Sequence, residues 1–498
     1  MTGGEDRNFA GALLAASAER LDSPFLTDDD GTTITYGGFY DQVRSYAAAL
    51  LDAGAAPGDR VLVQVEKSPQ AVALYVACLW AGAAHVPLNP NFTDDERSYF
   101  VADASPSVVV VDPAENAEPG WLTLAPDGTG SLVDRATRLG PTGCADPVPR
   151  GATDLAAILY TSGTTGRPKG AALTHEGLHD NAQGLHEAWQ FTGDDHLIHA
   201  LPIFHVHGLF VALHCAMLSA IPVRFHRRFD PASAIADFAF GTVFMGVPTH
   251  YSRLCSSGRL TPAAAAGMRL FTCGSAPLTE TAFDEFAELS GHRICERYGM
   301  SETGITISNP YDGDRIAGTV GYVLPGVEAR IVDETGVEVP HNAVGVVAIR
   351  SRQVMREYWG RPEATADSYI ADGWFVTGDV GSMAADGRIT LQGRASDMII
   401  SGGENVYPKE IELVLDDIDG ITESAVIGVP DADFGERVVA VLVCEAGPVD
   451  EATIRSHLDG TLARFKHPRR LEYVDTLPRN AMGKVQKSQL RQRYADSN

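Results

Sequence analysis

The sequence predicts an α/β protein that is built from more than one domain. Its 498 residues exceed the length at which a single hydrophobic core keeps growing. Short apolar runs rich in β-branched residues alternate with amphipathic stretches, which is the pattern of strands layered against helices. We find no internal repeat of the kind that solenoids and propellers require, so a layered globular fold is favoured.

The first part of the chain contains the clearest strands of this fold. Val108–Val111 and residues 155–160 are continuous apolar runs, and each predicts a short buried strand. A loop rich in glycine and threonine follows the second run, and we expect a helix to begin near Thr174. Residues 113–151 are rich in proline and glycine, so we expect them to form a loop.

After Gly321 the sequence changes to short strands and turns, which predicts a small strand-rich subdomain. The polar stretch 393–397 then separates the last hundred residues, so we expect domains at residues 1–394 and 395–498. A helix is expected at 408–416, because it would place Ile411, Leu415 and Ile418 on one side. The other elements expected after Gly321 are strands at 328–332, 345–351, 424–429 and 437–444 and a helix at 451–462.

Composition and charge exclude several classes of function. Hydrophobic residues make up 44% of the chain, yet no apolar run reaches the roughly 18 residues that cross a bilayer. The N-terminus lacks a basic segment followed by an apolar one, so we expect a cytoplasmic protein with no membrane partner. Lysine and arginine number 39 against 65 acidic residues, and the net charge of −26 argues against nucleic-acid binding.

The cysteines predict neither a disulfide framework nor a zinc site. They are odd in number and scattered, and no Cys-x-x-Cys pair occurs. We expect most of them to be small buried residues. The seven are Cys78, Cys144, Cys215, Cys255, Cys273, Cys295 and Cys444.

One loop points to phosphate chemistry. Residues 160–170 read Tyr-Thr-Ser-Gly-Thr-Thr-Gly-Arg-Pro-Lys-Gly directly after an apolar strand. Glycines allow backbone N–H groups to converge on an anion, and hydroxyls and a lysine complete such a cradle. Pro168 stands where a Walker A loop needs glycine, so the loop is of another type. Taken alone, it is equally consistent with a flexible surface loop.

This loop resembles the phosphate-binding loop of the adenylate-forming superfamily, which includes acyl-CoA synthetases, firefly luciferase and the adenylation domains of peptide synthetases. The resemblance covers essentially the whole chain. It implies a large multi-layer N-terminal domain of two α/β subdomains and a small distorted β-barrel, followed by a smaller, mobile α+β domain. Six further segments resemble motifs of the superfamily in the same order: 79–90, 274–278, 296–302, 374–379, 393–394 and 478–484.

The resemblance implies an enzyme that uses ATP and Mg²⁺ to activate an acid as its adenylate. Residues 161–169 would hold the β- and γ-phosphates, with Mg²⁺ on Glu302 and Thr161. Tyr298 would lie against the adenine, while Asp379 and Arg394 would contact the ribose. The nucleotide-binding residues expected on this basis are Thr161, Ser162, Gly163, Thr164, Thr165, Gly166, Lys169, Gly274, Ser275, Ala276, Glu296, Tyr298, Gly299, Met300, Ser301, Asp379 and Arg394.

By the same resemblance, Lys484 is the residue expected to catalyse adenylation, with Glu302 and His205 as further catalytic residues. Its ammonium group would bridge the attacking carboxylate and the α-phosphate. The C-terminal domain would then turn about a hinge near Ser396 and open a path for coenzyme A. As a hypothesis, acetylation of Lys484 would stop the enzyme, with a lysine acetyltransferase and deacetylase as partners. The expected coenzyme A loop is Ser401, Gly402, Gly403 and Glu404.

Arg297 gives the best indication of the acid. A buried guanidinium is costly unless it is paired, and it matches a carboxylate through two hydrogen bonds. This predicts a short dicarboxylic acid, and the segment around Arg297 resembles that of malonyl-CoA synthetases. Malonate is therefore the expected acid, with methylmalonate tolerated. The alternative is that Arg297 pairs with Glu296 or Glu302 and contacts no substrate.

The remaining acid-binding residues are expected to be His205, His207 and Ser275. The two histidines would point the same way from a strand, but no third ligand is spaced to hold a metal with them. Three other functions stay open: an adenylation domain that loads a carrier-protein thiol, a coenzyme A ligase for another small acid, and a nucleotide-binding regulator without catalysis. The presence of Lys484 argues against a regulator without catalysis, because such a protein has no need of this residue.

Overall fold

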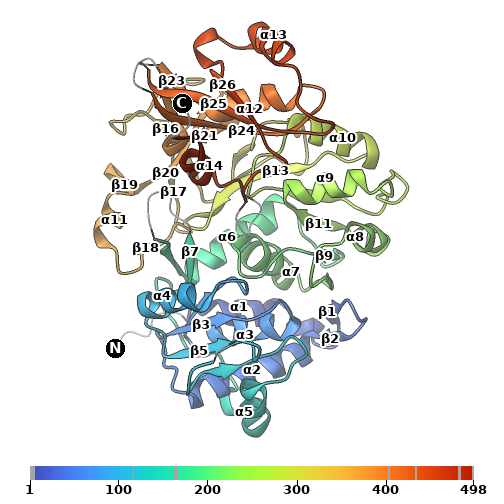
Figure 1. Cartoon of the computed structure of the whole chain (residues 1–498). Helices are drawn as coiled ribbons and strands as arrows, with labels where there is room; N and C mark the ends of the chain where they lie inside the picture. Colours follow the sequence, from blue (N-terminus) through green and yellow to red (C-terminus); the bar gives the residue numbers. More distant parts are fainter. Residues whose placement is uncertain are drawn as a thin grey trace.

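The computed structural model describes residues 6–115, 117–161, 167–401, 404–431, 434–479 and 484–495. Within them the strands form four sheets, and the predicted α/β class is confirmed (Figure 1). Figure 1 shows the N-terminal sheet and its helices, in blue, at one end of the molecule and the C-terminal elements, in orange and red, at the other. No helix in the described ranges is long and apolar enough to cross a membrane.

The first sheet carries the glycine-rich loop. Its inner strands are parallel, and β8 turns back antiparallel to β7 on the far side of that loop. The helices α2 and α3 pack together beside the sheet (Figure 1). In spatial order the strands are β18 (Glu357–Tyr358), β8 (Lys169–Thr174), β7 (Leu155–Thr161), β4 (Ala84–Pro87), β3 (Arg60–Gln64), β5 (Val108–Val111) and β6 (Leu122–Thr123).

The second sheet supplies most of the candidate site. Five neighbouring pairs, from β13 to β1, are parallel, so the carboxyl ends of these strands lie along one edge. Its strands run in the order β15 (Tyr322–Val323), β14 (Gly304–Ser308), β13 (Cys295–Met300), β12 (Leu270–Cys273), β11 (Val243–Gly246), β9 (Leu197–His199), β10 (Val223–Phe225), β1 (Pro24–Asp28) and β2 (Thr33–Thr35).

Two smaller sheets follow along the chain. The third matches the predicted strand-rich subdomain and comprises β16 (Glu328–Val332), β17 (Gly345–Arg350), β19 (Tyr369–Ile370), β20 (Trp374–Met383) and β21 (Ile389–Arg394). The fourth lies beyond residue 397 and comprises β22 (Ile399–Ser401), β23 (Glu404–Val406), β24 (Ile421–Asp431), β25 (Gly435–Cys444) and β26 (Arg470–Tyr473).

The helices follow from ordinary capping and burial rules. Helix α3 (Pro69–Trp80) begins at Ser68, whose side chain accepts a hydrogen bond from the Ala71 N–H, and proline occupies its first position. Residues on all sides of α3 are apolar and buried, as expected of a helix in the core. The other α-helices are α1 (Phe9–Ala16), α2 (Tyr36–Asp52), α4 (Asp94–Ala104), α5 (Ser131–Leu139), α6 (His175–Ala188), α7 (His214–Leu218), α8 (Pro231–Asp237), α9 (Pro248–Ser256), α10 (Glu280–Ser290), α11 (Pro362–Ala366), α12 (Pro408–Asp416), α13 (Glu451–Thr461) and α14 (Lys487–Ala495).

Most sequence predictions of individual elements are confirmed, including the strand 108–111 and the helix 408–416 at their predicted limits. The helix expected near Thr174 is α6, with Thr174 as its N-cap. The seven cysteines are free, and six are buried. The expected loop at 113–151 is wrong, because α5 buries Leu132 and Ala136 there and packs against α2.

Candidate active site

The ends of β7 and β8 frame the predicted phosphate loop. Thr161 is the last residue of β7 and Lys169 the first of β8. The Lys169 ammonium lies 5.1 Å from the centre of the Tyr358 ring, a cation–π arrangement that orients it. The predictions for Ser162, Gly163, Thr164, Thr165 and Gly166 lie outside the described residues.

Glu302 lies in the turn between β13 and β14 and is buried. Its Oε1 accepts hydrogen bonds from the Tyr358 hydroxyl at 2.9 Å and the Thr161 hydroxyl at 3.4 Å. Burial raises the pKa of this carboxyl. A carboxylate beside a hydroxyl fits Mg²⁺, which prefers oxygen ligands. The described residues contain no cluster of three or more metal-binding side chains, so such an ion would need phosphate oxygens as well.

A second polar group consists of buried Tyr298 and Asp379 and the partly exposed Arg394. The Tyr298 hydroxyl donates to Asp379 Oδ2 at 2.5 Å, and Arg394 Nε lies 3.1 Å from Asp379 Oδ1. The Asp379 N–H donates to the Thr377 hydroxyl at 3.0 Å, which fixes the backbone at the carboxylate. Each carboxylate oxygen keeps a further lone pair, so Asp379 is held in place yet can accept ribose hydroxyls.

The loop after β12 approaches Arg297 closely. A Cβ on Gly274 would come within 2.6 Å of the Arg297 guanidinium, so any other residue there would displace that side chain. The next residue, Ser275, has a φ of +72°, a conformation that a side chain rarely adopts. Its hydroxyl lies 3.4 Å from His207 Nδ1. The strained residue therefore joins the loop to the predicted acid pocket.

Arg297 is buried without a carboxylate partner in the described part of the chain. It is 3% exposed, and its Nε and Nη2 find no hydrogen-bond acceptor there. Burial lowers the pKa of Arg297 to about 10. The alternative that Arg297 pairs with Glu296 or Glu302 is wrong, because Arg297 Nε and Nη2 have no hydrogen-bond partner among the described residues. The guanidinium group therefore has two N–H donors, on Nε and Nη2, that a carboxylate could accept from.

The two histidines do not lie on a strand, so that prediction is wrong. His205 sits in a bend, and His207 is the first residue of a π-helical segment, His207–Leu213. Gly208 permits this turn, since a Cβ there would collide with the Pro202 carbonyl oxygen. Burial and, to a lesser extent, nearby Lys484 lower the pKa of His205 to about 3. Burial and Arg297 lower the pKa of His207 as well, so both rings are neutral.

Lys484 joins this site from the far end of the chain. Its side chain keeps solvent contact, yet enough protein surrounds it that desolvation is the main cause of its lowered pKa. The charges that act on it next are those of Arg394, Asp379, Glu302 and Arg297, in that order. The structure therefore brings Lys484 near enough to both Asp379 and Arg297 for their charges to act on it.

Only part of the expected coenzyme A loop lies within the described residues. Ser401 is buried at the end of β22, whereas Gly402 and Gly403 lie outside the described residues, as does the side chain of Glu404. Sequence reasoning missed Tyr358, which binds Glu302 and faces Lys169. A tyrosine of a two-residue strand gives no signal of such a role, because only the pairing of β18 with β8 brings it there.

Glu296, next to Arg297 on β13, yields a test of site electrostatics. It is buried, its Oε1 has no partner in the described residues, and burial raises its pKa from 4.5 to about 8. Between these values the folded protein holds a proton that the unfolded chain has released. Stability from this group is therefore full below about pH 4.5 and falls as pH rises to about 8.

Glutamine cannot ionise, so the Glu296→Gln variant is expected not to show this decrease in stability as the pH rises. In the ligand-free protein its Tm relative to wild type should rise by about 2 °C or more between pH 6 and pH 8.5. Differential scanning fluorimetry at both pH values measures the difference. Glu288→Gln, on the exposed face of α10, is the matched control. A Tm difference that is the same at both pH values would contradict the assignment.

Comparison with known proteins finds relatives that match nearly the whole chain. Residues 14–359 match the model of the AMP-binding enzyme family, and residues 410–484 match that of its C-terminal domain. A malonate–CoA ligase of Arabidopsis thaliana is 33% identical, over 98% of this chain and 85% of its own length. ATP-bound MatB from Rhodopseudomonas palustris is 45% identical and superposes with a TM-score of 0.94 over 98% of this chain and 99% of its own. The apo form of that MatB superposes with a TM-score of 0.85 over 99% of both chains, so the arrangement described here is nearer the ATP-bound one.

Proposed function

The chain belongs to the AMP-binding enzyme family, and from that premise we propose that it joins malonate to coenzyme A at the expense of ATP. The acid is first converted to malonyl-adenylate with release of pyrophosphate, and the thiol of coenzyme A then displaces AMP. The observation that carries the choice of acid is the buried, unpaired guanidinium of Arg297.

A dicarboxylic acid resolves the cost of this buried cation. Leaving Arg297 Nε and Nη2 without acceptors costs on the order of 1–3 kcal/mol or more. The second carboxylate of malonate offers two oxygens in the geometry of the guanidinium fork. His207 and Ser275 lie beside it and would complete the binding of that carboxylate, while a monocarboxylic acid would leave Arg297 unpaired.

The adenylation step needs positive charge where two anions meet. The reacting carboxylate oxygen bonds to the α-phosphorus as the bond from that phosphorus to pyrophosphate breaks. Lys484, which feels the charges of both Asp379 and Arg297, would balance the charge that develops there. Glu302 and Thr161 would hold Mg²⁺, which supplies further charge neutralisation on the phosphates.

For the second step we propose that residues 1–394 and 395–498 act as two domains that turn about the segment 395–397. Lys484 would leave the site, and Ser401–Glu404 would approach coenzyme A. The thiol sulfur then bonds to the acyl carbon and gives up its proton to solvent, while the bond from that carbon to the phosphate oxygen breaks and AMP leaves with this oxygen. We place the reaction in the cytoplasm, where ATP and coenzyme A are both available.

Two alternatives predict different products. A carrier-loading adenylation domain would release pyrophosphate with malonate but transfer nothing to coenzyme A. A ligase for another small acid would form the thioester of that acid in preference to malonyl-CoA. Amino-acid-activating relatives usually carry an aspartate where His205 stands here, and the neutral ring of His205 would not hold a substrate ammonium group.

The decisive assay measures ligation with ATP and coenzyme A across acetate, propionate, malonate, methylmalonate, succinate and glutarate. We expect malonyl-CoA, AMP and pyrophosphate in equal amounts, and a kcat/KM for malonate at least about 100-fold above that for propionate. Liquid chromatography with mass spectrometry identifies each thioester. Preference for a monocarboxylic acid, or pyrophosphate release without thioester, would refute the proposal.

A further inference from the structure

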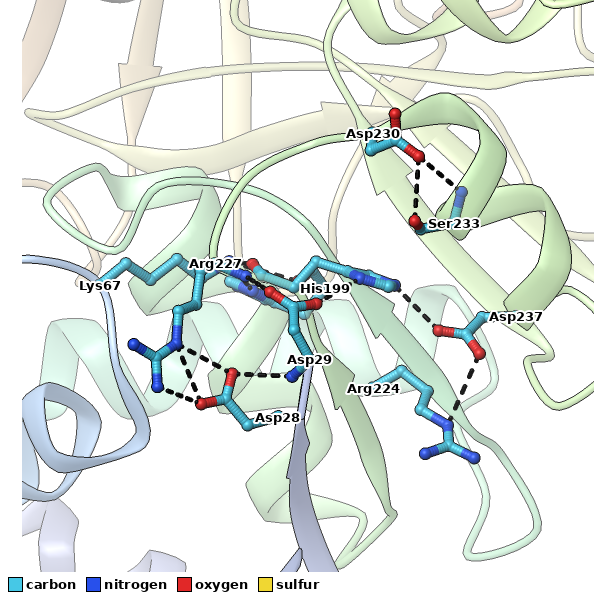
Figure 2. A network of polar contacts seen from close by, with 10 residues as sticks. Asp28, Asp29, Lys67, His199, Arg224, Arg227, Asp230, Ser233 and Asp237 are labelled. Carbon is cyan, nitrogen blue, oxygen red and sulfur yellow. Dashed lines mark hydrogen bonds and ion pairs between the residues drawn. The ribbon is translucent and has the colours of Figure 1, made fainter. Parts of the chain in front are cut away.

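A buried lysine lies behind the acid pocket, in a network of polar contacts that the proposed reaction does not use (Figure 2). Lys67 follows β3 and precedes the N-cap of α3, so it extends from the first sheet. Its Nζ lies 3.0 Å from His199 Nδ1, 3.2 Å from the His199 carbonyl oxygen and 2.5 Å from the His226 carbonyl oxygen. His199 and His226 stand at the carboxyl ends of β9 and β10 in the second sheet.

The ammonium group of Lys67 has neutral acceptors, although carboxylates are nearby. Among the described residues no carboxylate lies within ion-pair distance of Nζ, and desolvation lowers the pKa of Lys67 against the opposing effect of Asp29. Asp29 instead accepts a hydrogen bond from the His226 ring at 2.9 Å. The Phe225 ring lies 4.4 Å from Nζ and is the nearest cation–π contact. An apolar side chain would avoid this desolvation cost, so a specific role is needed to explain a lysine here.

The role follows from what His199 does with its other nitrogen. The Gly208 carbonyl oxygen can only accept, so the ring proton of His199 is on Nε2 and its Nδ1 accepts from Lys67. Nε2 donates to the Gly208 carbonyl oxygen at 2.9 Å. The Phe225 ring stacks on His199 at 5.2 Å and 13°, which leaves the imidazole little freedom. The Gly208 carbonyl oxygen thereby sets the tautomer of His199, and Lys67 holds the orientation of its ring from the other side.

Gly208 belongs to the first turn of the π-helical segment, directly after His207. That turn is tightly packed, since Gly208 has no room for a Cβ beside Pro202. His207 points to Ser275 and lies close enough to Arg297 for its charge to be felt. A displacement of the Gly208 carbonyl would therefore move His207 away from these partners.

We propose that Lys67 is a positioning residue for acid recognition: through His199 and the Gly208 carbonyl oxygen it holds His207 against Ser275 and Arg297. The inference rests on the proposed function of this pocket. It assigns Lys67 no contact with the substrate, because its ammonium hydrogens are taken by His199 and His226.

The test is Lys67→Met, which keeps the length of the side chain and removes its donors. We expect KM for malonate to rise about tenfold or more, while KM for ATP stays within about twofold. Steady-state ligation with each substrate varied in turn gives both constants. A role in general stability alone would lower the amount of active enzyme without separating the two KM values.

A double-mutant cycle with His207→Ala tests the route through His207. Lys67→Met is expected to raise KM for malonate by less than about twofold in the His207→Ala background. Asp230→Ala is the control, since Asp230 caps α8 through Ser233 in the same region of Figure 2 without touching Lys67. It should leave both KM values unchanged. The same factor for Lys67→Met in both backgrounds would overturn the proposal.

His199→Phe provides a second test that does not depend on the folding of the Lys67 variant. Phenylalanine keeps the stack on Phe225 and removes the donor to Gly208, so the same rise in KM for malonate is expected. An unchanged KM in His199→Phe would overturn the proposal. Failure of wild-type enzyme to ligate malonate would instead refute the proposed function, and the cycle would then be run with the acid that it does ligate.

Discussion

Lys484→Ala is expected to reduce formation of malonyl-adenylate by about two to three orders of magnitude and to leave thioester formation from supplied malonyl-adenylate within a few-fold of wild type. The reason is the position of Lys484, which is surrounded by the charges of Arg394, Asp379, Glu302 and Arg297. Pyrophosphate release with malonate and ATP measures the first step. Thioester formation from synthetic malonyl-adenylate and coenzyme A measures the second.

Lys487→Ala is the matched control for this prediction. Lys487 belongs to the same C-terminal tail, but its Nζ pairs with Glu412 at 2.6 Å, away from the site. Its loss should leave both steps unchanged. Acetylation of Lys484 removes the same charge and should reproduce the effect of Lys484→Ala. An equal loss in both steps would count against a lysine that leaves the site before the thiol arrives.

The elements that the sequence predicted well are those whose pattern is complete within the element. The run Val108–Val111 is apolar throughout, and Ile411 and Leu415 recur at helical spacing, so neither needs information from elsewhere in the chain. Helix α5 was missed because Gly130 before it and Gly140 after it gave the segment the composition of a loop. Its amphipathic spacing, with Leu132 and Ala136 buried, was the signal to use.

The site residues also fall into those with a signal in the local sequence and those without one. Arg297 was identified from the chemistry of a buried guanidinium, and the structure adds that Glu296 and Glu302 leave it unpaired. Lys67 had no local signal, because its role depends on the meeting of β3 with the ends of β9 and β10. The π-helical geometry at His207 likewise follows from the close packing of Gly208 on Pro202, which spacing along the chain does not reveal.

Arg297→Ala is expected to lower kcat/KM for malonate by about 100-fold or more and to leave that for acetate or propionate within about threefold. Truncating one partner of a buried charge pair costs about 2–5 kcal/mol, which corresponds to this range. Acetate and propionate lack a second carboxylate, so they gain nothing from the guanidinium in wild type and lose nothing without it. The ratio of the two kcat/KM values is therefore the quantity to compare.

Two further variants separate charge from geometry. Arg297→Lys keeps a cation but loses the planar guanidinium group, so kcat/KM for malonate should lie between those of wild type and Arg297→Ala. Arg293→Ala removes an exposed arginine just before the start of the same strand and should leave kcat/KM unchanged for every acid. Each variant must retain the wild-type Tm to within a few degrees, so that lost packing is not mistaken for lost recognition. If Arg297→Ala reduces kcat/KM for malonate and for propionate by the same factor, Arg297 does not recognise the second carboxylate. The assignment of a dicarboxylic acid as the substrate then fails.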